Sequence, residues 1–135
     1  MAYWLVKTEP GAWSWQDQVT AGTTHWHGVR NYQAANNMKA MRLGDQVFFY
    51  HSVAERRIVG IVEVSKLYYP DPSDATGKFG MVDIKAVQPL VEPVTLAAVK
   101  AEPKLAKMAL VTQSRLSVQP VTDGEWEILC PMGGI

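Results

Sequence analysis

The sequence predicts a mixed α+β domain built on an antiparallel, barrel-like sheet with short flanking helices. Several short segments alternate apolar and polar residues, as half-buried strands do, and they show no internal repeat. Short helical stretches lie between them without the regular strand–helix alternation of a parallel sheet. The 135 residues fit one domain spanning 1–135, and a hydrophobic share of 47% supplies material for a core.

The first half of the chain is expected to contain three strands and two helices. Ser14 can cap the first helix with Asp17 at its third position, and Gly44 suits a helix C-terminus. Residues 23–31 are expected to be irregular. Strands are predicted at 3–7, 45–51 and 56–69, the last two paired as a hairpin, and helices at 15–22 and 32–44.

The second half is expected to alternate extended and helical segments. Residues 70–80 are rich in Pro, Asp and Gly, so they form a loop, and Asp71 and Asp74 are assigned to turns rather than to an acid pair. Thr95 can cap a helix. Extended segments are predicted at 81–87 and 114–122, and helices at 95–101, 104–110 and 123–130.

Charge and cysteine content limit the classes of function. The formal net charge is zero, whereas proteins that bind nucleic acid mainly by neutralising phosphates are usually basic. Any nucleic-acid binding must therefore be local or depend on a pocket. The single Cys130 excludes an internal disulfide and fits a reducing, intracellular compartment, and no apolar run reaches the roughly 20 residues of a membrane span.

The stretch "HWHGVRNYQAANN", residues 25–37, combines the groups that hold a flat ring. A base reader needs stacking faces, planar polar groups for the base edge, and a contact to the sugar–phosphate. Trp26 offers a face, Asn31 and Gln33 offer planar amides, and Arg30 can bind a phosphate. The sequence therefore predicts a pocket whose members are Trp26, Arg30, Asn31, Tyr32 and Gln33, with Trp13 as a second wall.

Polar residues near strand ends are candidates for the rim of this pocket. His51 and Ser52 stand at the end of one predicted strand, and Ser117 and Gln119 alternate along the segment 114–122. A solvated strand face is the alternative for the second pair. Two of the pocket residues could have structural roles instead. Tyr32 could pack against its own helix, and Arg30 could pair with a carboxylate such as Glu9 or Asp45. We assign Trp4, Trp15 and Trp126 to the core.

A metal site or a catalytic site is less well supported by the residues. His25, His27 and His51 could together hold zinc, but no carboxylate or Cys stands at ligand spacing. His51 and Ser52 are neighbours on a strand, so their side chains point to opposite faces and cannot pair as base and nucleophile. We therefore predict no cofactor, no metal ion and no catalytic residue.

Six motifs in order give the chain a resemblance to the EVE domain family. They are "KTEP" (7–10), "HWHGVRNYQAANNMKAMRLGD" (25–45), "FFYHS" (48–52), "YYPDP" (68–72), "MVDIK" (81–85) and "SRLSVQPVT" (114–122). The resemblance implies a PUA-like β-barrel with one concave pocket, kinship with YTH domains, and no catalytic activity. It also implies binding of nucleic acid that carries a modified base, with modified cytosine in DNA favoured over RNA. The chain departs from the family in having Ala35 where Arg is common.

Three classes of function remain open at this point. The first is the base-binding module just described. The second is a small enzyme acting on a nucleoside or nucleotide, with His51 or His25 as acid or base. The third is a peptide-interaction or small-molecule-binding domain that uses the same aromatic cleft and is indifferent to base chemistry.

Overall fold

A computed structural model of the protein describes residues 2–135, in which helices and strands alternate irregularly along the chain. The strands are β1 (Tyr3–Thr8), β2 (Thr23–His25), β3 (Gln46–His51), β4 (Arg57–Pro70), β5 (Gly80–Thr95) and β6 (Val118–Val121). The helices are α1 (Trp15–Ala21), α2 (Tyr32–Ala40), α3 (Leu96–Ala101), the 3-10 helix η1 (Pro103–Leu105), α4 (Ala109–Thr112) and α5 (Asp123–Met132).

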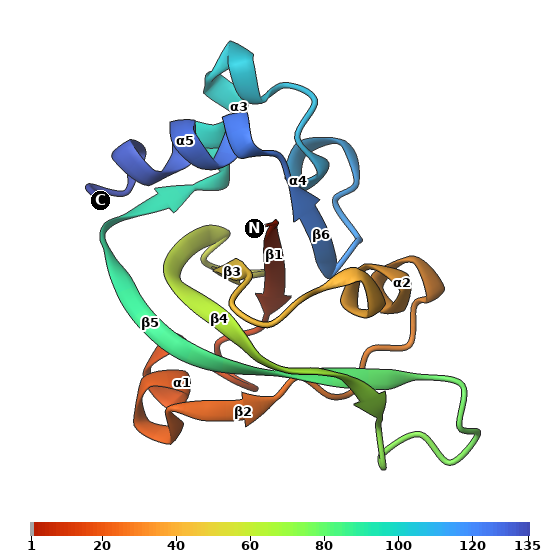
Figure 1. Ribbon diagram of the computed structural model, residues 1–135. Coiled ribbons are helices and arrows are strands. Elements are labelled where there is room, and N and C mark those ends of the chain that lie inside the picture. The colour runs from red at the N-terminus through yellow and green to blue at the C-terminus, as the bar shows by residue number, and fades with distance from the viewer. Residues whose placement is uncertain (1) are drawn as a thin grey trace.

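All six strands join one curved sheet in the order β2-β5-β4-β3-β1-β6 (Figure 1). The predicted mixed α+β class is confirmed. The expectation of a wholly antiparallel sheet is wrong in one place, because β1 runs parallel to β3, with Tyr3 opposite Gln46. Within residues 2–135 the strand order ends at β2 and β6 without a pairing between them, so closure into a barrel stays a prediction.

The β4–β5 hairpin forms the long arm of the sheet and curves around the other strands (Figure 1). The sequence predicted this strand only over residues 81–87, whereas β5 continues through Pro89 and Pro93 to Thr95. In the structure β2 covers β5 only at residues 83–85, so the later part of β5 is an edge. Proline is tolerated at an edge because its missing N–H takes no hydrogen bond from the sheet.

Local signals placed most helices correctly but not every boundary. Ser14 caps α1 in a full capping box, since its side chain accepts the Asp17 N–H and Asp17 accepts the Ser14 N–H. The predicted end of α2 at Gly44 is wrong. Helix α2 ends at Ala40, and Gly44 instead takes a left-handed conformation in the turn before β3. Two further corrections are that residues 23–25 form β2 and that the predicted helix 104–110 is divided into η1 and α4.

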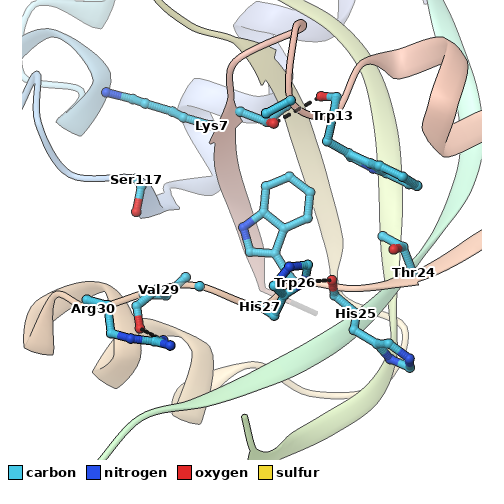
Figure 2. A pocket seen from close by; sticks show the side chains of 12 residues that line it. Lys7, Trp13, Thr24, His25, Trp26, His27, Val29, Arg30 and Ser117 are labelled. Atoms are coloured by element: carbon cyan, nitrogen blue, oxygen red, sulfur yellow. Dashed lines mark hydrogen bonds between the residues drawn. The ribbon is translucent and has the colours of Figure 1, made fainter. Parts of the chain in front are cut away.

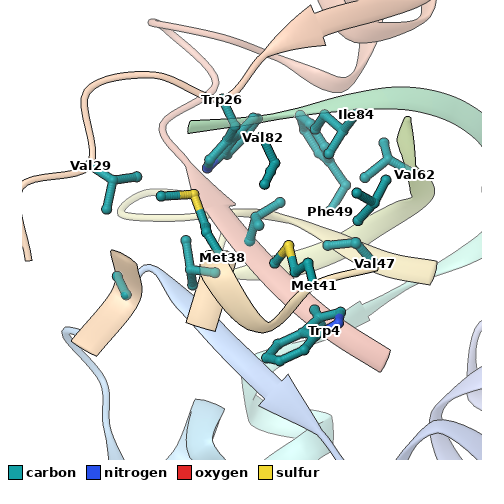
Figure 3. Packing of buried hydrophobic residues seen from close by; sticks show 14 of the residues in the cluster. Trp4, Trp26, Val29, Met38, Met41, Val47, Phe49, Val62, Val82 and Ile84 are labelled. Atoms are coloured by element: carbon teal, nitrogen blue, oxygen red, sulfur yellow. The ribbon is translucent and has the colours of Figure 1, made fainter. Parts of the chain in front are cut away.

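Both faces of the sheet are covered, which explains the unbroken apolar run in β3. Val47 and Phe49 point into one cluster, while Phe48 and Tyr50 point into a second cluster on the opposite face. The first cluster packs against α2 and includes Trp26 (Figure 3). The second packs against the C-terminal helices. The pocket described below borders the first cluster.

Trp4, Trp15 and Trp126 were assigned to the core, and the structure confirms this for Trp4 and Trp126 but only in part for Trp15. Trp4 and Trp126 are buried, one in each cluster. Trp15 is only partly buried, but its indole packs edge-on against Phe49 and lies directly over Gly60. Within residues 2–135, none of the helices has the length and apolar character needed to cross a membrane.

Candidate functional site

A pocket of about 400 Å³ opens at the ends of β1 and β2 (Figure 2). This volume lies within the range of about 300–1,000 Å³ that small-molecule sites occupy. Its wall comes from β1, the turn before α1, the segment from β2 to Arg30, and the turn before β6. The lining residues are Lys7, Thr8, Ala12, Trp13, Thr24, His25, Trp26, His27, Gly28, Val29, Arg30 and Ser117.

Trp26 lies at the centre of this pocket, between Trp13 and Lys7 on one side and Val29 on the other (Figure 2). The Trp26 indole is held in place because it packs edge-on against the core residue Phe49, with ring centroids 5.8 Å apart. Only 8% of the residue is exposed, so most of the indole belongs to the core. Trp26 therefore offers a rigid, limited apolar surface to a ligand.

Trp13 provides a second and more open aromatic wall. Its indole N–H donates to Oε1 of the buried Gln18 at 3.0 Å, and its carbonyl accepts the Thr8 hydroxyl at 2.9 Å. The ring is half-buried and packs against the first core cluster. These contacts hold the indole at the pocket without burying it, so a stacked ligand would meet a preformed face.

The segment that carries Trp26 is held in place by Asp71, in the loop after β4. Gly28, with a φ of 82°, donates its N–H to Asp71 at 2.8 Å, and Arg30 donates to the same oxygen at 3.3 Å. Ser73 donates its N–H and hydroxyl to the other oxygen. Burial opposes ionisation, but these donors outweigh it and hold the pKa of Asp71 well below its ordinary value.

Basic side chains gather at the pocket although the chain as a whole is neutral. The lining includes Lys7, Arg30, His25 and His27, and no carboxylate is among the lining residues within 2–135. Lys7 donates to the Ser114 carbonyl at 2.8 Å, and burial lowers its pKa from the usual value. The lining is therefore basic, although Asp71 and Asp83 contact Arg30 and His25 from behind it.

The three imidazoles have separate partners, which leaves no shared metal position. His25 contacts Asp83 and the Tyr69 hydroxyl, each at 2.9 Å, and His27 contacts the His25 carbonyl. His51 lies elsewhere and accepts the Trp15 N–H at 2.9 Å. In the described part of the chain, no group of three or more His, Cys, Asp or Glu is arranged to hold a metal ion.

The structure brings together four of the ten residues that the sequence singled out. Trp13, Trp26, Arg30 and Ser117 line the pocket. Arg30 also makes the carboxylate pair considered as its alternative, but with Asp71 instead of Glu9 or Asp45, because Asp45 accepts the Trp4 indole N–H.

The other six residues lie outside this lining, so the structure does not bring all ten into one pocket. Asn31 caps α2 through Ala34, and Gln33 bonds to Gln113, which places both beside a second hollow. Tyr32 is 62% exposed and packs on Phe79. The last three make structural contacts. His51 accepts the first N–H of α1, Ser52 donates its N–H to the Thr8 carbonyl, and the buried Gln119 donates to the turn before β6.

Sequence reasoning missed Lys7, Thr8 and His27 as pocket residues. Lys7 and Thr8 belong to "KTEP", a motif used only for the family resemblance, and they reach the pocket because β1 ends there. His27 was weighed only as a metal ligand. The missing signal was the parallel β1–β3 pairing, which brings the end of β1 beside the segment 26–30.

Comparison with known proteins identifies the family. The profile of the EVE domain matches residues 2–132. The chain belongs to the EVE domain family. Human thymocyte nuclear protein 1 is 34% identical over an alignment that covers 95% of this chain and 72% of that protein. The resemblance inferred from the motifs is thereby confirmed, and the fold is PUA-like.

Solved structures of other EVE domain relatives superpose closely. The NMR structure of Rpa0253 from Rhodopseudomonas palustris is 60% identical with a TM-score of 0.94, covering 99% of this chain and 94% of that one. The crystal structure of human THYN1 in complex with DNA containing 5-methylcytosine is 33% identical with a TM-score of 0.90, covering 100% and 99%.

Proposed function

We propose that this EVE domain binds DNA that carries a modified cytosine and takes the modified base, flipped from its stack, into the pocket of Trp13 and Trp26. The observation that carries this proposal is the pair of fixed indoles in a carboxylate-free, basic pocket of about 400 Å³. The relation to human THYN1, whose structure contains 5-methylcytosine DNA, supports this choice of ligand.

Base stacking can supply binding energy without a strongly basic surface, which suits a protein with no net charge. Stacking on an aromatic side chain is worth roughly 1–3 kcal/mol per base, which compares with the few kcal/mol that base flipping costs. The hydroxyls of Thr8 and Ser117 and the ring of His27 supply polar contacts for the base edge. Lys7 and Arg30 supply positive charge at the mouth for the sugar–phosphate. Binding is thus expected to be weak for unmodified DNA.

The proposed role is non-catalytic and uses no cofactor. Lys7 and His27 contact carbonyls and His25 contacts Asp83, and within residues 2–135 no hydrogen bond joins any of the three to a Ser, Thr or Cys side chain that could act as a nucleophile. His51, the other candidate, is turned towards α1. We further propose that residues 1–135 act as one domain, that the curved sheet functions as a PUA-like barrel, and that DNA is preferred to RNA.

Binding of short labelled duplexes, followed by fluorescence anisotropy, tests the proposal. The wild type is expected to bind duplexes with 5-methylcytosine more tightly than unmodified ones, and RNA of the same sequence less tightly. Trp13→Leu should abolish the preference for the modified base. Tyr32→Ala is the matched control, because Tyr32 is an exposed aromatic outside the pocket. Equal binding of all duplexes, unchanged in Trp13→Leu, would refute the proposal and leave the cleft to a peptide or small metabolite.

A further inference from the structure

A second hollow of about 340 Å³ adjoins the pocket and has a different character. It lies between the start of α2 and the turn before β6. Its lining consists of Asn31, Gln33, Thr112, Gln113, Ser114, Arg115 and Leu116. On the basis of the proposed function, we infer that this hollow binds the phosphodiester group next to the flipped base, and that Arg115 is its main contact.

Consecutive residues of the chain line the two hollows on both walls. Arg30 lines the first and Asn31 the second, while Ser117 lines the first and Leu116 the second. Consecutive Cα atoms are about 3.8 Å apart, so the two sites are neighbours on the scale of one nucleotide. Lys7 strengthens this link, because it lines the first pocket and donates to the carbonyl of Ser114 in the second. A strand whose base enters the first pocket would therefore place an adjacent phosphate at the second.

Arg115 has the chemistry that a phosphate needs and is free to supply it. Its side chain is exposed, and within residues 2–135 it has neither an ion-pair partner nor a side-chain hydrogen bond. A guanidinium binds phosphate oxygens with two parallel hydrogen bonds. Arg30 is less available, because Asp71 and Ser73 already accept its hydrogen bonds. Of the two arginines beside the pockets, Arg115 is therefore the unoccupied one.

The lining of the second hollow supports an anionic ligand. All residues of the lining except Leu116 are polar or basic, and none is acidic. The first turn of α2, which forms one wall, also contains no acidic residue. A phosphate at this position would meet donors without meeting a competing carboxylate.

The wall that carries Arg115 is held rigidly from behind. Gln119 is fully buried and donates from Nε2 to the carbonyls of Leu116 at 2.9 Å and Gln113 at 3.3 Å. Gln33 joins the two walls by donating to Gln113 at 2.9 Å. Gln119 is thus a positioning residue for the turn that presents Arg115. A preformed wall lowers the entropy that a ligand loses on binding.

Single neutral methylphosphonate linkages test the inference without altering the base. Duplexes with one 5-methylcytosine carry the methylphosphonate at the phosphate on its 5′ side or on its 3′ side. Each is titrated against the wild type, Arg115→Gln and Arg42→Gln. Arg42 is the matched control, since it is exposed, lies outside both hollows, and has no ion-pair partner within residues 2–135.

At one of the two positions the methylphosphonate should weaken wild-type binding about tenfold, as expected for a lost hydrogen bond to a charged group. Arg115→Gln should bind the natural duplex about tenfold more weakly and lose nothing further with the methylphosphonate. Its preference for 5-methylcytosine over cytosine should be unchanged, because the first pocket is intact. Arg42→Gln should behave like the wild type.

Two outcomes would overturn the inference. One is an equal methylphosphonate loss in the wild type and Arg115→Gln at both positions, and the other is an Arg115→Gln affinity equal to that of Arg42→Gln. Failure of the proposed function has a different signature, namely equal wild-type affinity for modified and unmodified duplexes.

Discussion

Gly28 donates its backbone N–H to the carboxylate of Asp71 at 2.8 Å, although 43 residues separate them in the sequence. The Asp71 side chain is completely buried and also accepts from Arg30 and Ser73. One carboxylate thereby ties the segment that carries Trp26 to the loop after β4. The shape of the pocket depends on this contact.

Removing this carboxylate should destabilise the protein and loosen the pocket together. Asp71→Ala leaves the Gly28 and Ser73 donors without their acceptor, so we expect the free energy of unfolding to fall by roughly 2–3 kcal/mol. Asp71→Asn keeps an acceptor oxygen and should lose less. Urea denaturation measures both variants. A wild-type value for Asp71→Ala would show that the contact contributes nothing to stability.

Acid should destabilise the protein through the same loop. Hydrogen bonds, first that of the Thr76 hydroxyl, lower the pKa of Asp74 from 3.8 to about 2. The unfolded chain therefore binds a proton in this window that the folded chain does not, and stability falls as the pH drops from about 4 to 2. Asp71, whose pKa is also lowered, acts in the same direction. Denaturation at several pH values should show a shallower acid decline for Asp74→Asn, and an unchanged decline would contradict this role.

Gly60 should be intolerant of any side chain. A Cβ at this position would lie 2.5 Å from the Trp15 ring, which is wedged against Phe49. Gly60→Ala should therefore lower the free energy of unfolding by about 1–3 kcal/mol, the usual effect of overpacking. Gly11→Ala is the control, because a Cβ there has no neighbour within 4 Å. Equal melting temperatures for the two variants would show that Trp15 moves aside freely.

His51 should contribute to the stability of the fold through one hydrogen bond. Its Nε2 accepts the N–H of Trp15, the first residue of α1, which has no acceptor within the helix. His51→Leu leaves that donor unpaired, so we expect a loss of about 1–3 kcal/mol in the free energy of unfolding. Glu55→Gln, which alters the exposed partner of the other ring nitrogen, should change stability by less than about 1 kcal/mol. Comparable losses in both variants would argue against this hydrogen bond.

Short-range signals predicted much of the fold. The capping box of Ser14 and Asp17 and the Thr95 cap placed helices correctly because each depends on residues within one turn. The full length of β5 and the end of α2 were missed because both depend on distant partners. Gly44, for example, sits where its N–H meets the Val64 carbonyl of another strand.

The sequence predicted the kinds of residue in the candidate site better than it predicted which individual residues line it. Trp13, Trp26, Arg30 and Ser117 were identified by residue type, and the fold brings them to one pocket. The backbone direction at the start of α2 carries its first residues away from that pocket to the second hollow and the surface. No local pattern encodes which side of a helix start faces a cleft, so sequence reasoning could not separate the two groups.

The pairing of β1 with β6 determines when the pocket forms during synthesis. Lys7 reaches a carbonyl 107 residues further along the chain, at Ser114. At translation rates of roughly 5–20 residues per second, β1 leaves the ribosome many seconds before its second neighbour exists. The wall that bears Ser117 is added late, together with the Leu116 and Val118 side chains of the first cluster. The lining of the pocket is therefore complete only after residue 117 has been synthesised.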